Sequence, residues 1–132
     1  MNFLISVFWI FIFNGFTLQK ENKNNEFAIA SSEKHITIEL EYIIWGCECP
    51  NWITKEDYKK YSDNNLIAHC FYIEPADKNT NYLEDFYPGK QLLKVTGYFE
   101  KDKRIPDDLL NSEEIAKEAK MFVFFKSEII EK

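Results

Sequence analysis

The stretch Trp45-Gly46-Cys47-Glu48-Cys49-Pro50-Asn51-Trp52 lies where an alternating apolar segment ends and a charged, helix-like segment begins. It contains two of the chain's three cysteines and two of its three tryptophans. In an extended Cys-x-Cys backbone both sulfurs point to the same side, because side chains alternate. Pro50 fixes its own φ and biases Cys49 away from the helical region. The stretch is therefore predicted to be a stiff corner that presents two thiols.

The three cysteines, Cys47, Cys49 and Cys70, have several possible uses. A disulfide is the favoured interpretation, because an exported chain meets an oxidising compartment. A direct bond between Cys47 and Cys49 would close a very small ring, so we expect one of these two to bond to Cys70. The sulfur that is left over keeps two alternatives open, which are a metal site and a reactive thiol in redox chemistry.

The metal alternative uses Cys47, Cys49 and Cys70 as soft ligands for Zn or Cu(I). Its fourth ligand would be His69 or His35. His69 adjoins Cys70, and on a strand successive side chains point to opposite faces. This geometry weakens the ligand set and also weakens a catalytic dyad of the two residues. We therefore expect no cofactor, with Zn or Cu as the alternative.

Residues 3–13 (FLISVFWIFIF) form an apolar run that is too short to span a bilayer, which needs about 20 residues. The run has the length of the apolar part of a secretory signal peptide, although no Lys or Arg precedes it. Cleavage is expected after Thr17, with Ala30 as a second option and an uncleaved anchor as the alternative. No cysteine follows the run closely, so we expect a secreted or periplasmic protein rather than a lipoprotein.

The chain divides into a signal peptide over residues 1–17, a polar, flexible linker over 18–34 and a single β-rich domain over 35–132. Its formal net charge is −6, which argues against binding nucleic acid and against an anionic membrane surface. After cleavage no transmembrane span is expected. The expected partner is a protein or a small-molecule ligand.

Four segments have the composition of strands. Residues 35–45 (HITIELEYIIW) alternate most clearly. One face of this strand is expected to carry the apolar residues Ile36, Ile38, Leu40, Tyr42 and Ile44. Residues 66–74 and 90–100 predict a second and a third strand. Residues 121–129 are nearly all apolar at first, which predicts a central strand buried on both faces.

Two short helices are expected between these strands. Thr54 can cap the first helix, with Asp57 at the third helical position. Asn111-x-x-Glu114 is a variant of the capping box and predicts a second helix over residues 112–120.

Val95-Thr96-Gly97-Tyr98-Phe99 has a glycine inside a strand, which predicts a bulge or a sharp coil. This five-residue segment resembles the glycine-containing strand of small OB-type barrels. We therefore expect a mainly β (α+β) fold, either a small curved antiparallel sheet or a partly open OB-like barrel, with two short helices. A four-stranded α+β sandwich is the alternative.

The leading functional hypothesis is an exported, non-enzymatic module that binds a protein or a small ligand and is stabilised by a disulfide. Its recognition surface would consist of Trp45, Trp52, Tyr58 and Tyr61, aromatic residues that could equally pack in the core. The alternative is a metal-binding or thiol-redox protein that uses the Cys-x-Cys motif. An enzyme is the least favoured class, because the chain contains no nucleophile elbow, phosphate-binding loop or His-x-x-x-His motif.

Overall fold

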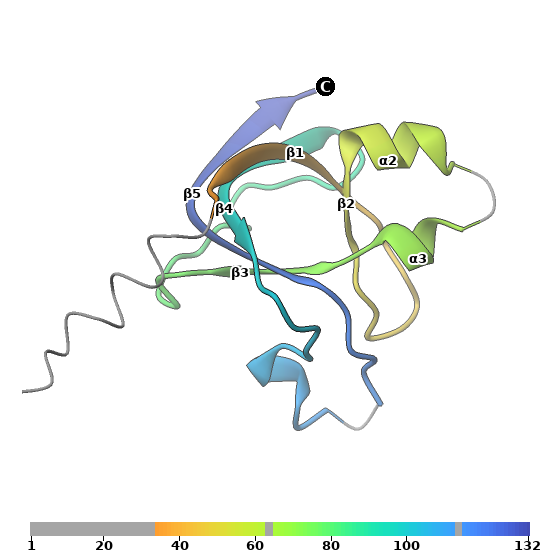
Figure 1. The fold of residues 1–132 in the computed structure, drawn as a ribbon. Coiled ribbons are helices and arrows are strands. Elements are labelled where there is room, and N and C mark those ends of the chain that lie inside the picture. Colours follow the sequence, from red (N-terminus) through yellow and green to blue (C-terminus); the bar gives the residue numbers. More distant parts are fainter. Residues whose placement is uncertain (1–33, 63–64, 113–114) are drawn as a thin grey trace, which may run out of the picture. The chain divides into compact units, whose positions relative to one another are not determined.

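The computed structural model describes residues 34–62, 65–112 and 115–132, which belong to one compact unit. The predicted signal peptide and nearly all of the predicted linker lie outside these described residues. Figure 1 shows the short elements of the unit, which are, in chain order, β1 (Ile36–Tyr42), β2 (Trp52–Thr54), α2 (Lys55–Lys60), α3 (Leu66–His69), β3 (Tyr72–Pro75), β4 (Gln91–Phe99), the 3₁₀ turn η1 (Asp107–Leu109) and β5 (Met121–Glu131). No helix among the described residues is long and apolar enough to cross a membrane.

The five strands form one sheet in the order β2-β1-β4-β5-β3. All neighbouring pairs are antiparallel except β3 and β5, which run parallel. The expectation of a purely antiparallel sheet is therefore wrong, and the sheet is mixed. The loop over residues 76–90 is the reason, because it is long enough to carry the chain from β3 past β5 to the start of β4.

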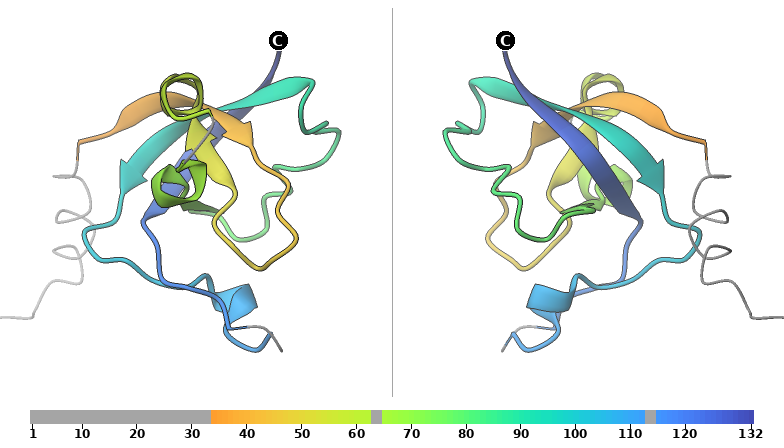
Figure 2. Two further views of the ribbon diagram at one scale, coloured as in Figure 1. Left: turned by 90° about the vertical axis from the view of Figure 1, so that its right-hand side faces the viewer. Right: turned by 90° about the vertical axis from the view of Figure 1, so that its left-hand side faces the viewer.

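The sheet curls into a half-barrel, as the two views of Figure 2 show. Trp52 at the start of β2 forms an isolated antiparallel bridge with Phe71, the residue before β3. The amide of Phe71 donates to the carbonyl of Trp52 at 2.8 Å, and the reverse bond is 3.3 Å long. These two bonds bring the outer strands of the sheet toward each other, which gives the curl its concave, apolar interior.

The core fills this concave side. Its buried members come from all five strands and from the bridge, and they are Leu40, Trp52, Phe71, Ile73, Leu93, Val95, Phe122 and Phe124. The predicted inner face of the first strand is confirmed for Ile36, Ile38, Leu40 and Tyr42, which belong to or pack against this core. Ile44 is an exception, because β1 ends at Tyr42 and the Ile44 side chain is 77% exposed.

The first predicted helix is confirmed, and the second predicted strand is confirmed only in its second half. Thr54 caps α2, and its hydroxyl accepts a hydrogen bond from the amide of Asp57 at 3.1 Å. The segment predicted as a strand over residues 66–74 begins instead with one helical turn, α3. A short apolar run such as Leu66–His69 has no periodicity that separates a helical turn from a strand, and Leu and Ala favour helix.

The second predicted helix, over residues 112–120, is wrong. Its proposed capping residue Glu114 lies outside the described residues, and residues 115–118 are irregular. Ala119 pairs in an antiparallel bridge with Arg104, with mutual backbone hydrogen bonds of 3.0 and 3.3 Å. This pairing extends the chain toward β5, which a helix over the same residues would prevent. The short helices of the structure are therefore α2 and α3.

The third and last strands are confirmed as β4 and β5, and they pair along most of their length. Their register shifts between Thr96 and Gly97, which confirms the predicted bulge. A Cβ atom at Gly97 would collide with the carbonyl oxygen of Val123 on β5. The glycine therefore allows the two backbones to approach closely at the point where the sheet bends.

We expect Gly97→Ala to lower the free energy of unfolding by about 3 kcal/mol, because the added methyl group would have to push the β5 backbone away. Urea unfolding followed by tryptophan fluorescence measures this change. Gly46→Ala is the matched control, since a Cβ atom there meets nothing within 4 Å. Equal stability of the two variants would show that the β4–β5 approach is not tight at this position.

Candidate functional site

The Cys-x-Cys corner is the loop that joins β1 to β2, over residues 43–51. The amide of Ile43 donates to the carbonyl of Asn51 at 2.7 Å, which closes the base of the loop. Trp45 folds back across it, and its indole N–H donates to the carbonyl of Pro50 at 2.9 Å. The corner is therefore held by its own backbone and by one tryptophan, in agreement with the predicted stiff corner.

Within the corner the sulfurs of Cys47 and Cys49 lie at disulfide distance and form a bond with each other. The predicted bond from the corner to Cys70 is not present, because Cys70 is a free, buried cysteine. This is a correction with a local cause. The helical turn α3 directs the Cys70 thiol back toward its own start, where it donates to the carbonyl of Leu66 at 3.2 Å.

The side chain of Cys70 is 7% exposed, and this burial raises the pKa of its thiol to about 11. A thiol in that state is a weak nucleophile and a weak metal ligand, because both roles require the thiolate. The neighbouring His69 stacks on the ring of Tyr61 at a centroid distance of 3.6 Å. His35, the other candidate ligand, packs edge-on against Phe125 at 4.9 Å.

The predicted metal ligands are therefore not brought together as a set. Among the residues that the structure describes, no group of three or more His, Cys, Asp or Glu side chains could hold a metal ion. Cys47 and Cys49 are engaged with each other, while Cys70 and His69 belong to α3 and its cap.

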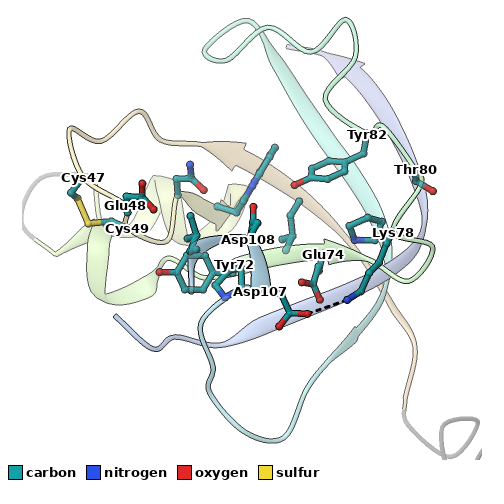
Figure 3. Close-up of a pocket in the computed structure, with 16 residues that line it drawn as sticks. Cys47, Glu48, Cys49, Tyr72, Glu74, Lys78, Thr80, Tyr82, Asp107 and Asp108 are labelled. Atoms are coloured by element: carbon teal, nitrogen blue, oxygen red, sulfur yellow. Dashed lines mark hydrogen bonds and ion pairs between the residues drawn. A yellow bond between two sulfur atoms is a disulfide. The ribbon is translucent and has the colours of Figure 1, made fainter. Parts of the chain in front are cut away.

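A pocket of about 540 Å³ lies beside the corner, and we call it the corner pocket. Figure 3 shows its lining, to which four parts of the chain contribute. These are the corner and β2 (Cys47, Glu48, Cys49, Asn51, Trp52), β3 (Tyr72, Ile73, Glu74, Pro75), the following loop (Lys78, Thr80, Tyr82), and η1 with the residue before it (Pro106, Asp107, Asp108, Leu109).

Ion pairs hold part of this lining in place. Asp107 and Lys78, both largely exposed, approach to 3.0 Å at the rim and join η1 to the loop after β3. Arg104 donates to Glu74 on β3 and also to Glu100, with 2.7 Å between its Nε and the Glu100 carboxylate. The two carboxylates that anchor Arg104 thus fix the connection between β4 and β5 against the body of the domain.

Two tyrosines of the pocket have raised pKa values, chiefly because they are buried. Burial raises the pKa of Tyr82 to about 12, and the carboxylates of Asp108 and Glu74 contribute to the rise. Burial also raises the pKa of Tyr72, with a contribution from Glu48. The Tyr72 hydroxyl donates to the carbonyl of Lys117 at 2.9 Å, which orients its ring.

The four aromatic residues predicted to form one recognition surface are divided between the core, the corner loop and α2. Trp52 is 3% exposed and packs in the core, although its edge also lines the corner pocket. Trp45 covers the corner loop, and Tyr61 stacks on His69. The partly exposed ring of Tyr58 lies 6.0 Å from the Lys132 ammonium.

Sequence reasoning missed the residues that complete the pocket, chiefly Tyr82, Glu74 and Asp108. They lie 20 to 60 positions beyond the corner, with Glu74 on the short strand β3 and Tyr82 and Asp108 in connections that have no strand periodicity. The only available signal was the density of aromatic and acidic residues in the loops over 75–90 and 101–108, which is also typical of solvated turns.

A second pocket, of about 500 Å³, lies on the other side of the corner, and we call it the helix-side pocket. Its walls include Cys49 and Pro50 of the corner and residues of α3. Its charged lining consists of three lysines (Lys103, Lys117 and Lys120) and two carboxylates (Asp57 and Glu118). Cys49 lines both pockets, so the two pockets meet at the corner.

Comparisons with known proteins give no further guide. No family model, no curated protein and no solved structure matches this chain.

Peptide mapping tests the cysteine assignment. Trypsin should release residues 35–55 with Cys47 and Cys49 on one peptide, lighter by two hydrogens until it is reduced, while Cys70 is alkylated directly after denaturation. Intact mass before and after alkylation should count one thiol without reductant and three with it. A cross-linked peptide that contains Cys70 and either corner cysteine would refute the assignment.

Cys70 should also make the stability depend on pH. The pKa of the Cys70 thiol is raised from 9.0 to about 11 in the folded state. The contribution of the protonated, buried thiol to the stability is therefore complete below pH 9 and is lost as the pH rises toward 11. We expect the free energy of unfolding to fall over this range, and to fall less steeply in Cys70→Ala. Urea titrations of both proteins at several pH values measure the two slopes, and parallel slopes would contradict the prediction.

Proposed function

We propose that this chain is an exported, non-enzymatic binding module of small size, and that its ligand occupies the corner pocket. The observation that carries the proposal is the pocket itself. Its volume of about 540 Å³ lies inside the range of about 300–1,000 Å³ typical of small-molecule sites. Its lining combines apolar and aromatic side chains with a few charged groups, which is the composition of such sites.

We further propose that the half-barrel is of the OB type. The strand order supports this, because the bridge between Trp52 and Phe71 joins β2 to β3 and makes the order cyclic. In OB folds the ligand binds on the face of strands 2 and 3, between the loops that follow strands 1 and 4. The corner is the loop after β1, and η1 lies in the connection after β4, and both contribute to the corner pocket.

The pairing of the charged groups supports binding rather than catalysis. Lys78 is engaged with Asp107, Glu74 is engaged with Arg104, and the Tyr72 hydroxyl donates to a backbone carbonyl. These contacts position the walls of the pocket.

Export is proposed from the apolar run over residues 3–13, and the disulfide inside the corner is consistent with an oxidising compartment. The mass measurement described for the cysteines also reports the N-terminus. Cleavage after Thr17 would remove residues 1–17 and leave every charged side chain of the chain in place.

Amide chemical shifts test the location of the ligand site. Three probes of different charge, N-acetyl-argininamide, N-acetyl-glutamate and N-acetylglucosamine, are titrated separately into the ¹⁵N-labelled protein. We expect at least one probe to shift the amides of residues 46–52, 72–74 and 78–82, which line or adjoin the corner pocket.

The variant Thr80→Trp places a large ring at this lining and should abolish those shifts. Ala68→Trp, in the helix-side pocket, is the matched control and should leave them unchanged. Shifts confined to residues 54, 57 and 67–70, which line the helix-side pocket, would overturn the proposed site. The absence of shifts at both pockets would also overturn it.

A second candidate function, thiol redox chemistry, is favoured by one observation, which is the exposed position of Cys47 in the disulfide pair. The zinc or copper alternative has less support. After reduction the corner could offer two thiolates, but Cys70 would have to break its contact with Leu66 to join them. Metal analysis of the purified protein distinguishes this alternative from the binding module.

A further inference from the structure

We propose that the ligand of the corner pocket is an organic cation, with a guanidinium or ammonium head group on an aliphatic stem, as at the end of an arginine or lysine side chain. This proposal rests on the proposed function, because it names the chemical class that the same pocket accepts. Four carboxylates and one ammonium line the pocket, and the carboxylates belong to Glu48, Glu74, Asp107 and Asp108.

The fold gathers these charges from separate parts of the chain. Glu48 lies at the middle of the Cys-x-Cys motif, Glu74 lies on β3, and Asp108 lies in η1. In the view of Figure 3, Asp108 lies near the middle of the lining, with Glu48 on one side and Tyr82, whose hydroxyl is directed inward, on the other. The negative charge is therefore a property of the pocket and not of one acidic segment.

The internal cations leave part of this charge uncompensated. Lys78 binds Asp107, and Arg104 binds Glu74 from outside the lining. Asp108 makes no ion pair with any described residue, and its charge acts on the Tyr82 phenol, whose pKa burial and Asp108 together raise. A cation placed beside Asp108 would offset this charge.

The remaining lining selects the kind of cation. The partly exposed ring of Tyr82 offers aromatic surface, which attracts guanidinium and ammonium groups more strongly once they are partly desolvated, while Trp52 and Tyr72 reach the lining with only 3% and 4% of their surface exposed. Ile73 and Leu109 offer apolar contact for a methylene stem, which long cationic side chains bury readily. A bare metal ion fits less well, since no group of three or more ligands in the described chain could hold one.

The helix-side pocket provides an internal contrast. It has a similar volume and shares Cys49, but lysines outnumber carboxylates in its lining. A cation should therefore bind more tightly at the corner pocket than at the helix-side pocket. This contrast allows a control that changes the net charge of the protein equally on either side of the corner.

The test compares N-acetyl-argininamide with N-acetyl-citrullinamide, a neutral analogue of nearly the same shape, by amide chemical-shift titration of the full chain. We expect the cation to bind at the corner pocket at least fivefold more tightly than the neutral analogue. Asp108→Asn should weaken the cation about two- to fivefold, because this carboxylate is exposed. Glu118→Gln, with the same charge change in the helix-side pocket, should leave the affinity unchanged.

A further arm identifies the source of the cation. If the peptide Gly-Gly-Arg-Gly-Gly binds more tightly than N-acetyl-argininamide, the natural ligand is a basic polypeptide. If the two affinities are equal, the natural ligand is a free cation. Equal binding of the arginine and citrulline probes at the corner pocket would overturn the cation proposal and leave the binding module intact. An Asp108→Asn affinity equal to that of wild type would also overturn it. Failure of every probe at that pocket would remove the proposed function as well.

Discussion

The pair of backbone hydrogen bonds between Trp52 and Phe71 is the constraint on which the rest of the structure depends. It joins strands that lie at opposite edges of the sheet, and both side chains are almost fully buried. The Trp52 ring packs edge-on against Tyr42 at 4.9 Å, and the Phe71 ring packs edge-on against Phe99 at 5.0 Å. Because the bonds are shielded by these rings, they close the curl from within the core.

The corner pocket exists because of this closure. The bridge places the Cys-x-Cys loop next to β3, so that Glu48 and Tyr72 can line one space. The connection after β4 completes the wall, since Arg104 is tied to Glu74 and to the extended segment at Ala119. A pocket supported in this way is largely preformed, which limits the conformational cost of binding.

Much of the sheet could be predicted from the sequence. The alternation in β1, the apolar start of β5 and the glycine of β4 each have one physical explanation, and the structure agrees with all three. The cap of α2 followed equally from Thr54, because a hydroxyl at that position satisfies an otherwise unpaired amide.

The pairing of the cysteines and the turn α3 could not be predicted, for related reasons. The direction of the Cys70 thiol is decided by whether Leu66–His69 is helical, and four residues carry no periodic signal. The corner pocket could not be predicted for a different reason. Tyr82 and Asp108 come from loops, where position is set by tertiary contacts such as the Lys78–Asp107 pair rather than by local propensity.

Cys49 touches two cavities of opposite electrostatic character through a single short loop. An occupant of one cavity that displaced this loop would alter the room available in the other. In that case thermodynamic linkage would require the effect to be reciprocal, with each occupant changing the affinity for the other by the same factor. Since the disulfide between Cys47 and Cys49 closes a ring of only a few atoms within this loop, the strength of such coupling would depend on the oxidation state of the two sulfurs.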